Sequence, residues 1–174
     1  MKIFALCLLL WAGLTIGYSK AAEVVTKEDA IQAIRDYRAA SKLIAGIHME
    51  LMRIDLGEKL EIPKARIEDY KRARKLLEQS VARNPYFPDA YLLLANSYWE
   101  IENDLARTVE FYTKALEVDP EYDDIISARA AVHLQLNQVE AAEKDLERLV
   151  ALGSEHADPI REEIARVKNA DADK

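Results

Sequence analysis

Apolar residues recur along the chain at spacings of three and four, and no segment of useful length alternates apolar and polar positions. This is the period of an amphipathic helix and not that of a strand. The longest stripe predicts a helix from an N-cap at Thr26 to about Leu56, with Gly57 as its stop. Its members are Ala30, Ala33, Tyr37, Ala40, Ile44, Ile47, Leu51 and Ile54.

Shorter helices follow, separated by Pro, Gly, Asn and Asp. The pattern predicts helices over 63–83, 89–102, 104–118, 123–136, 139–152 and 159–169. Asp158 is the predicted N-cap of the last one, with Pro159 at its first position. We therefore predict an all-α protein with one helical domain over residues 24–170 and a frayed tail over 171–174.

Pairs of short helices suggest an internal repeat, and one is present. Tyr91, Leu94, Ala95 and Tyr98 align with Ile126, Arg129, Ala130 and His133 at an offset of 35 residues. In the second helices, Thr108, Tyr112 and Ala115 align with Ala142, Leu146 and Leu149 at an offset of 34. Ala73, Leu77 and Ser80 supply a further second helix upstream. Small residues at 95, 130 and 142 allow close helix packing, and such units must stack to bury their apolar faces.

This pattern resembles the tetratricopeptide repeat family over residues 65–152. The Tyr91 unit matches the family pattern at Tyr91, Leu94, Ala95, Tyr98, Tyr112, Ala115 and Pro120, whereas the next unit departs from it at Arg129, His133 and Ser154. The resemblance implies a helical-hairpin solenoid of about three repeats, with a long N-terminal helix and a C-terminal capping helix.

The N-terminal residues have the order of a secretory signal peptide. Lys2 precedes an apolar run over residues 3–17, and Ser19 and Ala21 fit the −3 and −1 positions of a cleavage site. Residues 1–21 are thus predicted to be removed, which gives a periplasmic or secreted protein. The alternative is an uncleaved run that anchors the chain to the inner membrane, although a span usually needs about 20 apolar residues.

Composition excludes several functions. The chain has one cysteine and a net charge of −7. Cleavage after Ala21 would remove Cys7, so no disulfide or thiolate site is expected. Residues 84–174 carry 20 acidic and 9 basic side chains, whereas residues 22–83 carry 11 and 13. The acidic balance argues against nucleic-acid binding, and the uneven charge leaves a homo-oligomer open.

No set of residues can be assigned catalytic roles, so we predict that the chain is not an enzyme. His48, His133 and His156 are far apart in sequence, and neither a metal nor another cofactor is predicted. A basic run gives a possible basic surface patch, for lipid or an acidic partner. The alternative is a salt-bridged solvated face, because acids interleave with the cations. The patch comprises Lys71, Arg72, Arg74 and Lys75.

The resemblance implies that the first helices of the repeats line a concave groove. The groove residues it indicates are Asp89, Leu92, Asn96, Trp99, Glu100, Ser127, Ala131 and Leu134, together with Asp124 and Gln135. One branch of the family grips a terminal carboxylate with cations at such positions. Here Leu92, Ser127 and Ala131 stand there instead, and only Asn96 fits.

We therefore expect a scaffold, adaptor or assembly factor of the cell envelope that binds a partner peptide or helix. Trp99 is the candidate hot spot, with ordinary packing as its alternative role. The alternative function is an accessory or ligand-binding subunit of a transport or substrate-handling system.

Overall fold

The computed structural model describes residues 25–51 and 64–172, with side chains described within 25–47 and 66–170. Within these ranges the chain forms seven helices and no strand. The predicted signal segment, the first helix beyond Leu51, Gly57, Pro63 and residues 173–174 lie outside the described residues. None of the described helices is long and apolar enough to cross a bilayer.

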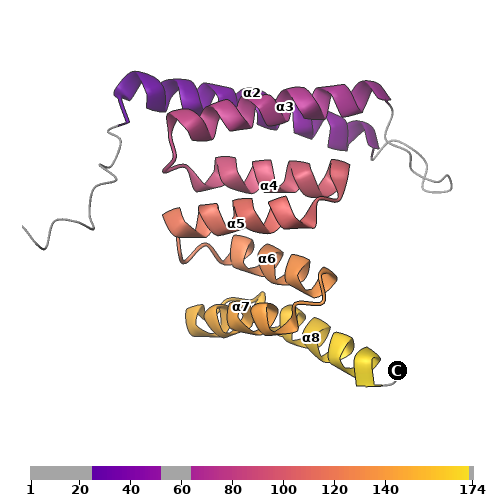
Figure 1. Cartoon of the computed structure of the whole chain (residues 1–174). Coiled ribbons are helices and arrows are strands. Elements are labelled where there is room, and N and C mark those ends of the chain that lie inside the picture. Colours follow the sequence, from indigo (N-terminus) through magenta and orange to yellow (C-terminus); the bar gives the residue numbers. More distant parts are fainter. Residues whose placement is uncertain (1–24, 52–63, 173–174) are drawn as a thin grey trace, which may run out of the picture.

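The helices are α2 (Lys27–Leu51), α3 (Lys64–Arg83), α4 (Pro88–Glu102), α5 (Leu105–Val118), α6 (Asp123–Gln135), α7 (Val139–Leu152) and α8 (Ala157–Ala172). They are antiparallel pairs stacked one on the next, from the α2–α3 layer at one end to α7 and α8 at the other (Figure 1). Each helix contacts its neighbours in the chain, and α8 also contacts α6. This confirms the predicted fold class, a helical-hairpin solenoid.

Helix starts follow their capping residues. The Thr26 hydroxyl accepts the Asp29 N–H at 3.0 Å and donates to the Asp29 carboxylate at 2.6 Å. The Asp104 carboxylate accepts the Arg107 N–H at 3.0 Å, as an N-cap should. The predicted cap of α8 is wrong, because this helix begins at Ala157 and Asp158 lies in its first turn. The same helix continues to Ala172, past its predicted end at Asn169.

Three tight turns use left-handed backbone. Asn103, Asn137 and Gly153 have φ angles of 49°, 55° and 66°. Gly153 ends α7, and its N–H together with that of Ser154 satisfies carbonyls of the last turn. Asparagine and glycine tolerate this conformation better than other residues do, which is why the short turns between paired helices fall at these positions.

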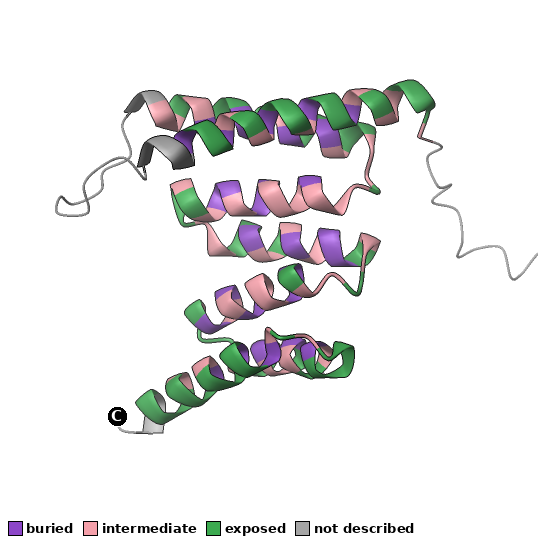
Figure 2. Cartoon of the chain, turned by 180° about the vertical axis from the view of Figure 1, so that it is seen from behind, coloured by how far each residue is buried: buried purple, intermediate pink, exposed green. Residues whose placement is uncertain are grey.

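The repeat pattern corresponds to the core. Ala95, Ala130 and Ala142 are fully buried, so the small residues lie where neighbouring helices approach closely. Buried residues occur on every helix of the stack (Figure 2). They form two clusters, one over α2, α3 and α4 and one from α4 to α8. Phe111 packs against both clusters and so connects them. The core is therefore continuous along the solenoid.

Candidate functional site

Side chains just before α4, α6 and α8 connect each of these first helices to the first helix of the preceding layer. The Tyr37 ring of α2 lies 4.8 Å, centroid to centroid, from Phe87, just before α4. The Tyr122 hydroxyl, just before α6, donates to Asp89 of α4 at 3.0 Å. Asp124 of α6 lies 2.9 Å from Nε2 of His156, just before α8. These contacts fix the spacing of the first helices, which carry the predicted groove residues.

Three of the predicted groove residues are held by tyrosines. Besides Asp89, the Asn96 amide oxygen accepts a hydrogen bond from the buried Tyr112 hydroxyl at 2.5 Å. The Glu100 carboxylate accepts one from the Tyr70 hydroxyl at 2.7 Å. Burial, then the hydrogen bond to Glu100, raises the pKa of Tyr70, so this phenol remains a donor in neutral solution. The polar part of the predicted surface is thus oriented by residues outside it.

Two of the apolar residues predicted for the groove line a hollow between α6 and α8. It has a volume of about 400 Å³ and is lined by Ala131, Leu134, Gln135, Pro159, Ile160, Glu163 and Val167. Ala131 and Leu134 were predicted for the groove, and Gln135 with them. Leu134 and Ile160 belong to the core cluster, whereas Gln135 is exposed at the edge. The lining is mainly apolar with an amide and a carboxylate, which suits an apolar anchor with a polar or basic flank.

The α8 contribution to this hollow was missed. The sequence indicates that Ile160, Ile164 and Val167 form the sparse stripe of a capping helix. In the structure Ile160 and Ile164 are buried, and Ile160 and Val167 also line the hollow. The spacing of three to four residues was the signal for a buried face. It could not show that part of this face would remain open beside α6.

The remaining predicted groove residues lie apart from the hollow. Its lining comes from α6 and α8 and includes no residue of α4. Leu92 is half-buried against the core, and Trp99 and Ser127 are also half-buried. The role of Trp99 as an anchor therefore stays a prediction.

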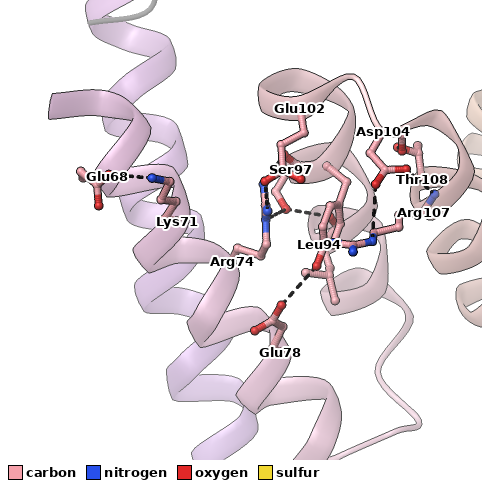
Figure 3. Close-up of polar contacts among 11 residues, drawn as sticks. Glu68, Lys71, Arg74, Glu78, Leu94, Ser97, Glu102, Asp104, Arg107 and Thr108 are labelled. Carbon is pink, nitrogen blue, oxygen red and sulfur yellow. Dashed lines mark hydrogen bonds and ion pairs between the residues drawn. The ribbon is translucent and has the colours of Figure 1, made fainter. Parts of the chain in front are cut away.

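One member of the predicted basic patch is not on the surface. Arg74 is buried, and its guanidinium points from α3 into α4 (Figure 3). It donates to the Ser97 carbonyl at 3.1 Å and to Glu102 at 2.5 Å, and it lies 4.1 Å from the centroid of the Tyr98 ring. The prediction that Arg74 is a surface cation is wrong because these polar partners and the ring face replace water around it.

The other three members, Lys71, Arg72 and Lys75, are exposed. Lys71 pairs with Glu68 at 2.8 Å, and Arg66 pairs with Asp69 at 3.0 Å. Both pairs have the i,i+3 spacing that the salt-bridged alternative requires. The cations of α3 are thus partly paired along their own helix.

Histidine and carboxylate groups meet at the start of α6. Ligand atoms of Asp123, Asp124 and His156 lie within 4.8 Å of one another. The two Asp123 oxygens already accept the Asp124 N–H at 3.0 Å and the Ser154 hydroxyl at 2.8 Å. The Ser154 bond is the main cause of the lowered pKa of Asp123. A helix N-terminus also disfavours a cation, so the contacts amount to capping and we assign no metal here.

Comparison with known proteins supports the resemblance. A family model described as "Tetratricopeptide repeat" matches residues 100–158, less than half of the chain. The matched segment runs from the end of α4 to the start of α8 and includes the turn with Asn137. No curated protein matches the chain.

Several solved structures share the fold. The first tetratricopeptide domain of Spaghetti (RPAP3), bound to the HSP90 peptide SRMEEVD, has a TM-score of 0.60 and 19% identity over 82% of this chain and 95% of that one. The TPR2B domain of yeast Sti1, in a pHsp70 complex, gives 0.59 and 12% over 80% and 98%. PcrH, in complex with the chaperone binding region of PopD, gives 0.51 and 13% over 75% and 95%. The shared architecture is the tetratricopeptide-type solenoid.

Proposed function

We propose that the chain is a non-catalytic interaction scaffold or assembly factor that binds a peptide or helix of a partner protein on the side of the first helices. The hollow between α6 and α8 carries the proposal, because an open apolar surface next to fixed polar groups is what a docked segment requires. The three similar structures above are complexes with an HSP90 peptide, with pHsp70 and with the chaperone binding region of PopD, which supports this mode of action.

The residues on the first helices do not suit an acidic peptide as the ligand. Leu92, Ser127 and Ala131 occupy positions where a carboxylate clamp would need cations. Glu163 lines the hollow, and Asp124 and Glu100 lie exposed on first helices. Residues 84–174 carry 20 acidic and 9 basic side chains. We therefore propose a partner segment with an apolar anchor flanked by neutral or basic residues.

The proposed setting is the cell envelope. It rests on residues 1–21, where one lysine, an apolar run and small residues stand in the order of an export signal. Tethering to the inner membrane by the same run is the alternative. Mass spectrometry of the N-terminus of the protein purified from its source distinguishes the two, because cleavage would leave Ala22 as the first residue.

Affinity capture from the envelope fraction tests the function, with variants that separate groove binding from general adhesion. Ala131→Arg places a long cation in the hollow and should abolish recovery of the partner. Ala165→Arg on α8 is the matched control, since Ala165 is exposed and is not among the lining residues. Equal recovery with both variants, each with an unchanged thermal unfolding curve, would exclude the hollow as the binding site.

Two further variants test the α4 part of the groove. Trp99→Ala and Asn96→Ala should weaken partner recovery if the predicted anchor and backbone-binding roles hold. Asn96→Ala also removes the acceptor of the Tyr112 hydroxyl, so Tyr112→Phe serves as its control. A thermal shift with a small metabolite, and no protein partner, would favour the accessory or ligand-binding function instead.

A further inference from the structure

A second concave surface lies at the other end of the solenoid. Between α2 and α3 there is a trough of about 570 Å³, lined by Ala39, Lys42, Leu43, Gly46, Arg66, Asp69, Arg72 and Leu76. It opens away from the rest of the stack, because α3 directs Tyr70 and Arg74 toward α4 from its other side. The α2–α3 pair is the end layer (Figure 1), so within the described residues no helix covers this trough.

The trough has an apolar floor and a cationic rim. Ala39, Leu43 and Leu76 supply the floor, and a Cβ added at Gly46 would meet no atom within 4 Å. Lys42, Arg66 and Arg72 line the trough, as does the carboxylate of Asp69.

Asp69 pairs with Arg66 at 3.0 Å and lies 4.0 Å from Arg72. The Arg72 side chain is 70% exposed. Lys42 is exposed as well, so Lys42 and Arg72 are the cations with which the rim attracts an anion.

The same charge and apolarity extend beyond the trough. Arg35 lies two helical turns before Lys42 on the same stripe of α2, and Arg38 is also exposed. Ile31 and Ile34 are 41% and 39% exposed on this helix. On the α2 side, the cationic rim of the trough therefore continues, with scattered apolar side chains.

The rest of the molecule has the opposite charge. The helices α2 and α3 together carry 11 basic and 7 acidic residues, whereas residues 84–172 carry 8 basic and 19 acidic ones. This separation gives the solenoid an electrostatic polarity along its length. Near an anionic surface, the α2–α3 end is attracted and the acidic remainder is repelled, so the molecule is oriented with this end inward.

We propose that the α2–α3 end layer docks on the surface of an anionic phospholipid bilayer, with one lipid seated in the trough. The headgroup phosphate meets Lys42 and Arg72 at the rim, and the adjoining apolar part of the lipid lies against Leu43 and Leu76. Interfacial helices with cations beside exposed isoleucines bind membranes by these two contributions together.

The extent of the face favours a bilayer over an acidic peptide. The trough extends only about 10 to 15 Å along either helix, at 1.5 Å per residue. The exposed cations extend further along α2, to Arg35 and Arg38, and a peptide bound in the trough would leave these two unmatched. A plane of many headgroups matches them all. This inference does not depend on the hollow between α6 and α8, which lies at the other end of the stack.

Vesicle binding tests the proposal with the full chain. Binding is measured by co-sedimentation with vesicles of phosphatidylcholine alone or mixed with phosphatidylglycerol, and the readout is the ratio of the two partition coefficients. Residues 1–24 are present in every variant, so their contribution cancels between variants. We expect a preference for the anionic vesicles that falls as salt is added.

The variant Lys42→Gln/Arg72→Gln should lower binding to anionic vesicles about thirtyfold, given the usual contribution of each cation near such a surface. The matched control, Lys144→Gln/Arg161→Gln, removes one lysine and one arginine that are exposed at the other end. It should change binding no more than about twofold.

Three results of the binding measurements would overturn the proposal, and a competition experiment adds a fourth. The first is equal binding to both kinds of vesicle, and the second is an equal loss in the control, which would reflect net charge alone. The third is tight binding of an acidic helical peptide in the trough without retention on anionic vesicles. Glycerol phosphate at the same phosphate concentration should compete poorly, and full competition would show that the site binds only a phosphate and not a membrane.

Discussion

A buried ion pair joins α6 to α7 at positions where the preceding repeat has two apolar residues. This difference allows a quantitative prediction. Arg129 and Asp145 occupy the positions that Leu94 and Phe111 fill one repeat earlier, at offsets of 35 and 34. The two groups form a bidentate pair, with distances of 3.0 and 2.5 Å and side chains that are only 14% and 3% exposed. Leu94 is fully buried, and Phe111 packs against the cluster that contains it.

Removing either partner leaves a buried charge. Loss of one member of such a pair typically destabilises a protein by about 3 to 5 kcal/mol. The lower end applies here because each charge keeps a second neighbour. Arg148 lies 3.9 Å from Asp145, and Arg129 also donates to Thr113 at 3.1 Å. We therefore expect Asp145→Phe and Arg129→Leu each to cost about 3 kcal/mol, a fall in Tm of roughly 6 to 12 °C.

The double variant Arg129→Leu/Asp145→Phe should behave differently. It restores the pair found in the preceding repeat and leaves neither charge unpaired, so the change in unfolding free energy should stay within about 1 kcal/mol. Urea unfolding of all three variants gives the coupling energy, with Cm as the readout and the slope m as a check on cooperativity. Additive losses in the double variant would refute the reasoning, as would single variants that cost less than about 1 kcal/mol.

Three smaller predictions concern other contacts. Arg74→Ala should lower the free energy of unfolding, measured in urea, by about 2 to 3 kcal/mol because it removes charge-assisted hydrogen bonds to α4. The control Lys75→Ala, at an exposed position on the same helix, should change this free energy by less than about 0.5 kcal/mol. Thr26→Ala should cost about 1 kcal/mol by loss of the N-cap of α2, seen as lower helicity by circular dichroism, and an unchanged spectrum and stability would contradict that cap. Burial and the hydrogen bond to Asp89 raise the pKa of Tyr122 to about 12, so the folded state favours the neutral phenol. Stability should therefore be fully present below the ordinary value near 10 and fall as the pH rises toward 12, less steeply in Tyr122→Phe.

The sequence predicted the helices and their stacking because that information is local. Small residues such as Ala95 and Ala142, and the punctuation by Pro120 and Gly153, mark elements without knowledge of their neighbours. The ends were less well predicted, as α8 shows, because Ala157 before Asp158 carries no strong start signal. Its first turn is set by packing, since Ala157 and Ile160 are buried in the core cluster.

The site was harder to predict because it depends on contacts between repeats. The alternating charges of α3 indicate a solvated face. Arg74 is nevertheless buried, because its guanidinium contacts Ser97, Glu102 and the Tyr98 ring of α4. The repeat alignment did hold a signal, since Arg74 aligns with the half-buried Val109 one repeat later. The groove residues Ala131 and Leu134 were found by position in the repeat, whereas Pro159 and Glu163 on α8 had no counterpart in the pattern.

The most direct test of the central claim places a photo-crosslinking amino acid at Gln135, exposed at the edge of the hollow, and in a second protein at Lys144, exposed on α7. Illumination in the envelope fraction, followed by mass spectrometry, identifies what lies against each position. A scaffold that binds through its first helices predicts one defined partner segment crosslinked from Gln135 and not from Lys144. Equal crosslinking from both positions, or from neither when the partner is recovered, would contradict it.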